Sequence, residues 1–251
     1  MLVDQRRQQI LEITEKSGFV ALSELVERVG ASESTLRRDL DYLDGIGQIR
    51  RTRGGAAYVG DSITPFEVRG TRAKEQKQHI AAVAAALVQP GETVLLDAGT
   101  TVGAMGEFLR DTQRLTVITA GLTALEALAD ADDVRVECLG GTLRHLSQGF
   151  LGPLTEAALA RVSFDRAFLG ADAVTADRGI CEAELEQTRL KELMIERAGA
   201  VYVLAHAAKL GQRPFHAWAP LPPPVTLVTD CSATDEQIRP FTDAGIEVVT
   251  V

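Results

Sequence analysis

Seven short apolar runs recur between residues 93 and 251, and they constrain the fold more than any other feature of the chain. They are rich in β-branched residues, and the segments between them have the spacing of amphipathic helices. The expected strands lie at 93–97, 115–119, 134–139, 166–170, 200–205, 225–229 and 246–251, and the expected helices at 76–88, 102–110, 122–130, 153–162, 183–198 and 234–244. This alternation predicts an α/β domain built on a largely parallel sheet, which binds ligands beyond the carboxyl ends of its strands.

The first 57 residues have a different pattern. Leu36, Leu40 and Leu43 are spaced four and three residues apart, which predicts a helix from Ser32 to Leu43 with the leucines on one face. Two helical patterns precede it, at 4–17 and 23–29, with a short apolar run at 19–22 between them, and a Gly-bounded, Arg-rich hairpin follows at 45–55. Three helices and such a hairpin indicate a winged helix-turn-helix, in which the third helix enters the DNA major groove.

Composition excludes several classes of protein. No apolar run reaches the ~18 residues of a membrane span, and the N-terminus lacks the apolar core of a signal peptide, so we expect a cytoplasmic protein with no membrane partner. The three cysteines and four histidines are scattered without the spacing of metal ligands. We therefore expect no metal and no cofactor.

The net charge of −9 argues at first against nucleic acid as a partner. Residues 1–53, however, hold nine Lys/Arg and nine Asp/Glu, and the remainder holds 17 against 26, which accounts for the whole −9. A local basic face can thus exist on the small N-terminal domain, formed by Arg37 and Arg38 on the expected helix and by Arg50, Arg51 and Arg53 after it.

Polar turns follow the predicted strands of the larger domain. Residues 97–101, Asp-Ala-Gly-Thr-Thr, follow the first strand and open a helix, so backbone amides and two hydroxyls could cradle a phosphate. Further turns at 119–121, 140–141 and 170–172 should lie at the same sheet edge, and Lys209 could supply a cation. Residues 58–75 are polar and interrupted by Gly60, Pro65 and Gly70, which predicts a solvated linker between domains 1–57 and 76–251.

The motifs resemble one known family. The chain is similar to the DeoR family of bacterial transcriptional regulators over nearly its whole length. In the N-terminal part the resemblance rests on the run from Ile10 that includes SESTLRRDL, Leu43, Gly47 and residues 51–55. In the larger part it rests on DAGTT, LGGTLR, GFLGPLTEAAL, FLGADAV, Glu186, Lys191 and Lys209. The resemblance implies a C-terminal effector domain similar in fold to ribose-5-phosphate isomerase. It also implies that Ser34, Thr35, Arg37 and Arg38 face double-stranded operator DNA, with Arg51 and Arg53 on phosphates.

The same resemblance implies an effector site. The expected members are Asp97, Gly99, Thr100, Thr101, Gly141, Asp172, Glu186 and Lys209. Asp172 and Glu186 would lie near sugar hydroxyls, and Asp97, Gly99, Thr100, Thr101 and Lys209 would hold the phosphate. The chain departs from the family at Ala120, where Asn is usual, and at residues 206–208, where His-Ala-Ala replaces Asp-Ser-Ser. These changes remove polar groups beside Lys209.

The resemblance thus implies a homodimeric or larger repressor of a sugar or carbon-metabolism operon, controlled by a phosphorylated metabolite. The alternative is a sugar-phosphate isomerase with an appended DNA-binding module, because Asp172 and Glu186 are paired carboxylates suited to proton transfer. Ala173 and Val174 stand where the isomerase motif has further acidic residues, which favours a regulator over an enzyme. A protein-interaction module that does not bind DNA is the third possibility.

Overall fold

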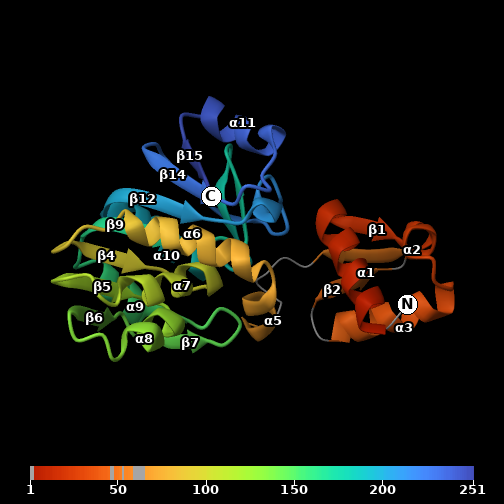
Figure 1. The fold of residues 1–251 in the computed structure, drawn as a ribbon, viewed down its shortest axis with the longest axis horizontal. Coiled ribbons are helices and arrows are strands. Elements are labelled where there is room, and N and C mark those ends of the chain that lie inside the picture. Colours follow the sequence, from red (N-terminus) through yellow and green to blue (C-terminus); the bar gives the residue numbers. More distant parts are fainter. Residues whose placement is uncertain (1–2, 46–47, 53, 59–65) are drawn as a thin grey trace. The chain divides into compact units, whose positions relative to one another are not determined.

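The computed structural model describes residues 3–45, 48–52, 54–58 and 66–251. The chain divides into two compact units, Met1–Pro65 and Phe66–Val251, and each is described by itself (Figure 1).

The N-terminal unit has the predicted three helices and a strand pair. In chain order it contains α1 (Val3–Ser17), β1 (Phe19–Ala21), α2 (Leu22–Val29), α3 (Glu33–Gly45), β2 (Ile49–Thr52) and β3 (Gly55–Tyr58). The strands form an antiparallel sheet in the order β1-β3-β2. The leucine stripe of α3 is buried as expected, packed with Ile10, Val20 and Leu25. This arrangement confirms a winged helix-turn-helix.

Local chemistry sets the turn between α2 and α3. Gly30 ends α2 at φ 69°, a left-handed conformation that glycine adopts without steric cost. The Ser32 hydroxyl then accepts a hydrogen bond from the Thr35 amide at 3.3 Å, and so caps the first turn of α3. The turn therefore fixes where the third helix begins.

The C-terminal unit is built on a seven-stranded parallel sheet. All seven predicted apolar runs form its strands: β4 (Thr93–Leu96), β5 (Leu115–Thr119), β6 (Val134–Cys138), β9 (Phe164–Leu169), β12 (Ala198–Leu204), β14 (Val225–Thr229) and β15 (Glu247–Thr250). Their order is β15-β14-β12-β9-β4-β5-β6, and every pairing is parallel. The strand order reverses between β4 and β9.

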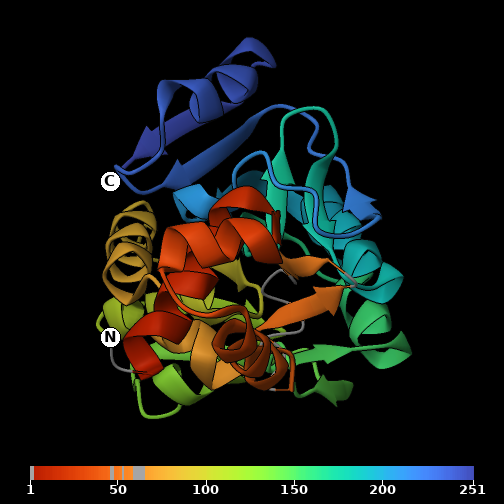
Figure 2. The ribbon, with the colours of Figure 1, turned by 90° about the vertical axis from the view of Figure 1, so that its right-hand side faces the viewer.

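Helices cover both faces of this sheet (Figures 1 and 2). One face carries α6 (Lys74–Ala86), α7 (Thr100–Leu109) and α8 (Leu122–Leu128), and the other carries α9 (Pro153–Leu159), α10 (Leu185–Arg197) and α11 (Asp235–Asp243). Side chains of one strand alternate between the two cores: Val94 and Leu96 pack under α6 and α7, whereas Leu95 packs on the α10 side. The result is a three-layer α/β/α unit.

Short antiparallel strands that the sequence did not predict lie at the carboxyl end of this sheet. β7 (Thr142–Arg144) pairs with β8 (Gly149–Leu151), and β10 (Ala173–Thr175), β11 (Gly179–Glu182) and β13 (Ala217–Ala219) form a separate sheet. A 3₁₀ turn, η1 (Ala207–Lys209), follows β12. These pieces are inserted between the main strands and their helices, so they surround the edge where a ligand was expected.

The predicted linker is too long at its C-terminal side. Residues 66–71 form α5 (Phe66–Thr71), and α6 begins at Lys74, so both belong to the C-terminal unit. Arg69, expected on a solvated connector, is only 6% exposed because α5 packs against α7. Residues 59–65 of the expected linker lie outside the described residues. Among the helices that are described, none is long and apolar enough to cross a membrane.

Candidate functional site

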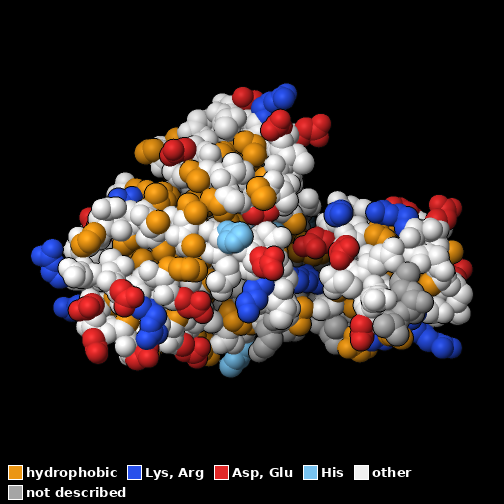
Figure 3. Space-filling view, viewed as in Figure 1, with side chains coloured by type: hydrophobic (Ala, Val, Ile, Leu, Met, Phe, Trp, Pro, Cys, Tyr) orange, Lys and Arg blue, Asp and Glu red, His pale blue; other side chains and the backbone are white. Residues whose placement is uncertain are grey.

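The outward face of α3 carries the predicted DNA-binding side chains. Ser34, Arg37 and Arg38 are exposed, opposite the buried leucines, and Thr35 is half-buried with its hydroxyl 2.8 Å from that of Ser32. Side chains of both charge signs lie on the visible face of the unit formed by α1 to α3 (Figure 3). The third helix thus presents hydroxyls and guanidinium groups as the sequence predicted.

Acidic neighbours hold two of the predicted arginines. Arg37 donates from Nε to Glu33 Oε1 at 3.0 Å, and Arg51 pairs with Asp41 on α3. Arg38 has no hydrogen bond or ion pair within the described part of the chain, so its guanidinium is available to a partner. Arg53 lies outside the described residues. Among the predicted arginines that the structure describes, Arg38 alone can therefore contact DNA without first breaking an ion pair.

The sequence analysis missed Asp39, the acidic residue of the RRDL motif. It is 2% exposed and accepts hydrogen bonds from Arg6 Nε at 2.6 Å and from Arg7 Nε at 3.0 Å, both on α1. Asp39 in turn raises the pKa of Arg6 above its ordinary value by this hydrogen bond. Arg7 also stacks over the Tyr42 ring at 3.6 Å. Asp39 therefore anchors α3 to α1 and does not face DNA.

The second site lies at the carboxyl ends of β4 and β9, where the strand order reverses and a parallel sheet opens a crevice. Asp97, directly after β4, accepts a hydrogen bond from the Gly170 amide after β9 at 2.9 Å and pairs with Lys191 of α10. Lys191 Nζ also donates to the Gly170 carbonyl at 2.7 Å and lies 3.2 Å from Glu182 Oε1. These three buried side chains tie two strand ends to a helix.

In this cluster two carboxylates surround a single cation. Burial lowers the pKa of Lys191, but the carboxylates of Asp97 and Glu182 together raise this pKa by more than burial lowers it. The net shift is upward, so the lysine stays charged. Glu182 accepts a further hydrogen bond from Gln187 at 3.1 Å. Next to Glu182, burial raises the pKa of the Cys181 thiol to about 11. Glu182, on the unpredicted strand β11, is the carboxylate that the sequence analysis missed.

The predicted phosphate cradle has the expected backbone. Gly99 has φ 135°, which side-chain-bearing residues rarely adopt, and Thr100 and Thr101 begin α7. Gly149 approaches this loop so closely that an added Cβ would lie 2.6 Å from the Ala98 Cβ. The amide of Phe150 donates to the Ala120 carbonyl at 2.7 Å. The β7–β8 hairpin is therefore packed directly on the end of β5 and on the loop after β4.

Two predicted roles change in the light of this geometry. An ionised Asp97 has no hydrogen to donate to a phosphate, and its oxygens are engaged by Gly170 and Lys191, so it shapes the loop. Glu186 is exposed in the first turn of α10, and Glu182 occupies the interior position instead.

Gly141 has φ 118°, and an added Cβ would lie 2.6 Å from the Leu151 carbonyl oxygen. A glycine is therefore needed at this position because β8 approaches the backbone closely.

The remaining predicted residues lie at the same edge. Lys209 is buried and donates from Nζ to the Ala171 carbonyl at 2.6 Å, and the Asp172 amide donates to the Cys181 carbonyl at 3.2 Å. His206 is buried at the end of β12. The ends of β4, β9 and β12 thus bring together residues that are more than a hundred positions apart in the sequence.

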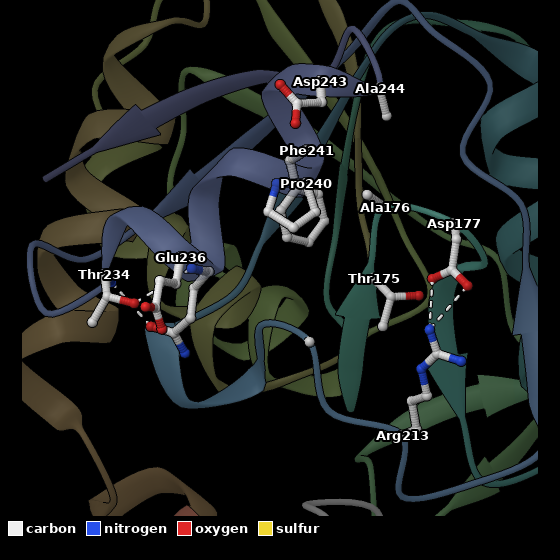
Figure 4. A pocket seen from close by; sticks show the side chains of 12 residues that line it. Thr175, Ala176, Asp177, Arg213, Thr234, Glu236, Pro240, Phe241, Asp243 and Ala244 are labelled. Atoms are coloured by element: carbon white, nitrogen blue, oxygen red, sulfur yellow. Dashed lines mark hydrogen bonds and ion pairs between the residues drawn. The ribbon is translucent and has the colours of Figure 1, made fainter.

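A separate cavity of about 620 Å³ lies elsewhere in the C-terminal unit. Figure 4 shows it between α11, which contributes Pro240 and Phe241, and the ion pair formed by Asp177 and Arg213. None of its lining residues belongs to the predicted effector site. The buried charges converge instead at the switch of the parallel sheet.

Comparisons with known proteins match both units. Residues 6–61 match the DeoR-like helix-turn-helix domain, and residues 72–231 match the DeoR C terminal sensor domain. The chain belongs to the DeoR family. Among curated relatives of this DeoR-family protein is the HTH-type transcriptional regulator FruR of Bacillus subtilis, 33% identical over 92% of each chain.

Two further relatives are repressors by name. The lactose phosphotransferase system repressor of Streptococcus mutans is 31% identical over 94% of this chain and 95% of its own. The glycerol-3-phosphate regulon repressor of Escherichia coli is 31% identical over 83% of each. The DeoR-family chain is accordingly a transcriptional regulator with a DNA-binding and a sensor domain, and the isomerase alternative is set aside.

Solved structures give only a distant likeness. Ribose 5-phosphate isomerase A from Methanocaldococcus jannaschii aligns with a TM-score of 0.40 and 18% identity over 54% of each chain. The α/β class of the C-terminal unit is confirmed by its own strand order and not by this match.

Proposed function

We propose that this DeoR-family regulator is a cytoplasmic, homodimeric repressor of a sugar or carbon-metabolism operon, released from its operator by a phosphorylated metabolite. The exposed N-terminal half of α3 is the observation that carries the DNA-binding part. Its hydroxyls and arginines lie on one face, and helices of this motif place that end against base edges. Two copies would read two half-sites, which matches the symmetry of most operators bound by such motifs.

The effector part of the proposal is supported by the strand-end loops. Glycine-rich turns after β4, β5 and β9 meet at one edge, and α7 begins there with two threonines. The names of two relatives, a lactose phosphotransferase system repressor and a glycerol-3-phosphate regulon repressor, associate those proteins with carbohydrate or glycerol-phosphate metabolism. A phosphorylated ligand that prefers one arrangement of the protein by ~1–3 kcal/mol would change operator affinity by roughly 5- to 150-fold.

The test measures binding of the full-length protein to its own upstream DNA over a salt series, with and without a panel of sugar phosphates. We expect tight binding that weakens steeply with salt, and weakening by at least one compound of the panel. Arg38→Ala should reduce operator affinity by about 1–3 kcal/mol because the available guanidinium is lost.

Arg161→Ala is the matched control, because Arg161 is an exposed arginine of the C-terminal unit. It should leave operator affinity unchanged. If Arg38→Ala binds as tightly as the unmodified protein, the assigned interface is wrong. If no phosphorylated compound alters DNA binding, the effector class is wrong.

A further inference from the structure

Arg69 is a buried cation with no acidic partner among the described residues. It lies on α5 with 6% of its surface exposed, donates from Nη2 to the Leu146 carbonyl, and stacks 5.5 Å from the Phe66 ring. Its Nε is buried without a hydrogen-bond partner, and no described carboxylate pairs with it. A buried guanidinium in this state is costly unless an anion completes its surroundings.

Two more buried donors without partners lie close in the fold. One is the hydroxyl of Ser147, the residue after Leu146. The other is the hydroxyl of Thr123, which lies in the first turn of α8 next to Gly103 of α7. The Leu122 amide donates to the Gln148 carbonyl at 2.8 Å, which places the start of α8 beside the turn that carries Ser147. Buried donors left without partners require an explanation, and three of them on segments joined by the Arg69–Leu146 and Leu122–Gln148 hydrogen bonds favour an anion.

A cavity of about 220 Å³ lies next to these donors. It is lined by Phe66 and Gly70 of α5, Lys74 and Lys77 of α6, and Thr100 and Thr123 at the starts of α7 and α8. The only carboxylate in its lining, within the described residues, is Glu107. The ten-residue helix α7 directs its N-terminal amides toward the Thr100 side, and a helix N-terminus carries partial positive charge. The cavity is therefore basic.

The neighbouring strand-end cluster has the opposite character. Asp97 and Glu182 are buried there, and the cation between them, Lys191, is already bonded to both. A phosphate dianion would be repelled by these carboxylates, whereas sugar hydroxyls could donate to them. The loop from Asp97 to Thr100 connects the two environments in the chain, because Asp97 belongs to the cluster and Thr100 lines the cavity.

We propose that the phosphate of the effector binds beside α5, held by Arg69, Ser147, Thr123 and the first turn of α7, with the hydroxylated part directed toward Asp97 and Glu182. The proposal rests on the phosphorylated effector of the proposed function and assigns its orientation. Because α5 is the first described element after the DNA-binding unit in the chain, the ligand would act on the segment that joins the two units.

The test titrates the full-length protein calorimetrically with inorganic phosphate, glycerol 3-phosphate, ribose 5-phosphate and fructose 6-phosphate, at constant ionic strength. We compare the unmodified protein with Arg69→Gln, Ser147→Ala and Thr123→Val. Arg69→Gln should weaken binding of the best phosphorylated ligand roughly 10- to 100-fold, and each hydroxyl deletion should weaken it several-fold. Arg161→Gln is the control and should bind as the unmodified protein does.

The outcomes separate the two proposals. If a sugar phosphate binds the unmodified protein and releases DNA, but binds Arg69→Gln equally well, the assigned phosphate position is wrong and the proposed function stands. If the unmodified protein binds no phosphorylated compound and none releases DNA, both proposals are wrong. If Arg69→Gln does not fold, as judged by circular dichroism, unchanged ligand affinity in both hydroxyl variants overturns the assignment.

Discussion

At the scale of single residues, Lys191 has the largest structural role in the sensor unit. It is 4% exposed and lies between Asp97, which follows β4, and Glu182, which ends β11. Two carboxylates, one in the loop after β4 and one on β11, thereby share a single cation. Because its pKa is raised by these partners, its contribution to stability is complete below about pH 10.4, the ordinary lysine value, and is lost only as the pH rises through the higher folded value.

Lys191→Met should lower the free energy of unfolding by about 3–5 kcal/mol at pH 8, because it leaves two buried carboxylates without their cation. The loss should be smaller at pH 5, where either carboxylate of the variant can take up a proton. Urea unfolding at both pH values measures this difference.

Arg189→Met on the same helix is the matched control. Arg189 is exposed, and its one ion pair within the described part of the chain is with Glu192, one helical turn away, so its loss should be small at both pH values. Equal losses for the two variants would contradict the role assigned to Lys191.

Residue roles were the least predictable part of this chain. The buried face of α3 followed from leucine spacing alone, because three leucines at helical spacing can only share one side. Glu186 was expected from the family resemblance, and Glu182 was missed because the strand that carries it was not predicted. Asp39 was missed and Arg69 was assigned to a solvated linker for a common reason: a charged residue is normally exposed, and only the tertiary contacts show that these two are buried.

At the scale of elements, α3 and the strand β2 are linked by acidic side chains that compete with DNA for the arginines. Asp41 pairs with Arg51, and Asp44 accepts a hydrogen bond from the Arg51 amide at 2.9 Å. Any contact of Arg51 with a DNA phosphate must replace Asp41. If Arg51 contacts phosphate as proposed, its acidic partner limits non-specific affinity at this end of the interface.

Asp41→Asn should increase affinity for operator and for unrelated DNA alike, by several-fold at low salt. It removes a negative charge near the backbone contacts and makes Arg51 available, so the magnitude of the slope of log affinity against log salt should rise by about 0.9, the value for one additional phosphate contact. Fluorescence anisotropy over a salt series measures both quantities. A variant with unchanged slope would show that Arg51 does not contact phosphate.

The large elements were predictable because their signals are long. Each of the seven strands of the parallel sheet is a dense apolar run, and the helices between them keep helical spacing over two or more turns. The pairs β7–β8 and β10–β11 have only three or four residues per strand, which is too short for an alternating pattern to stand out. α5 was assigned to a linker because Gly70 interrupts a six-residue helix that tertiary packing stabilises.

At the scale of the whole molecule, charge is divided between the two units. Residues 1–65 carry nine Lys/Arg and ten Asp/Glu, a net −1, and residues 66–251 carry 17 and 25, a net −8. The sensor unit should therefore be repelled by DNA, which confines the contacts to the N-terminal unit. Ligand binding and DNA binding can consequently be followed as separate events.

Trp218, the only tryptophan of the chain, lies on β13 and reports on the sensor unit alone. A phosphorylated effector at about a hundred times its dissociation constant should stabilise that unit by ~2.7 kcal/mol and raise the midpoint of the Trp218 fluorescence transition by roughly 5–10 °C. Operator DNA should leave this midpoint nearly unchanged. A panel of sugar phosphates that never moves the midpoint would contradict an effector site in the sensor unit.

The anchor formed by Asp39, Arg6 and Arg7 has a consequence for evolution and engineering. The contacts of these residues and the leucine stripe fix the alignment of α3. The outward positions 34, 37 and 38 are therefore not needed to hold the helix in place. Substitutions at these three positions, in evolution or by design, should therefore change the operator preference while the fold of the N-terminal unit is kept.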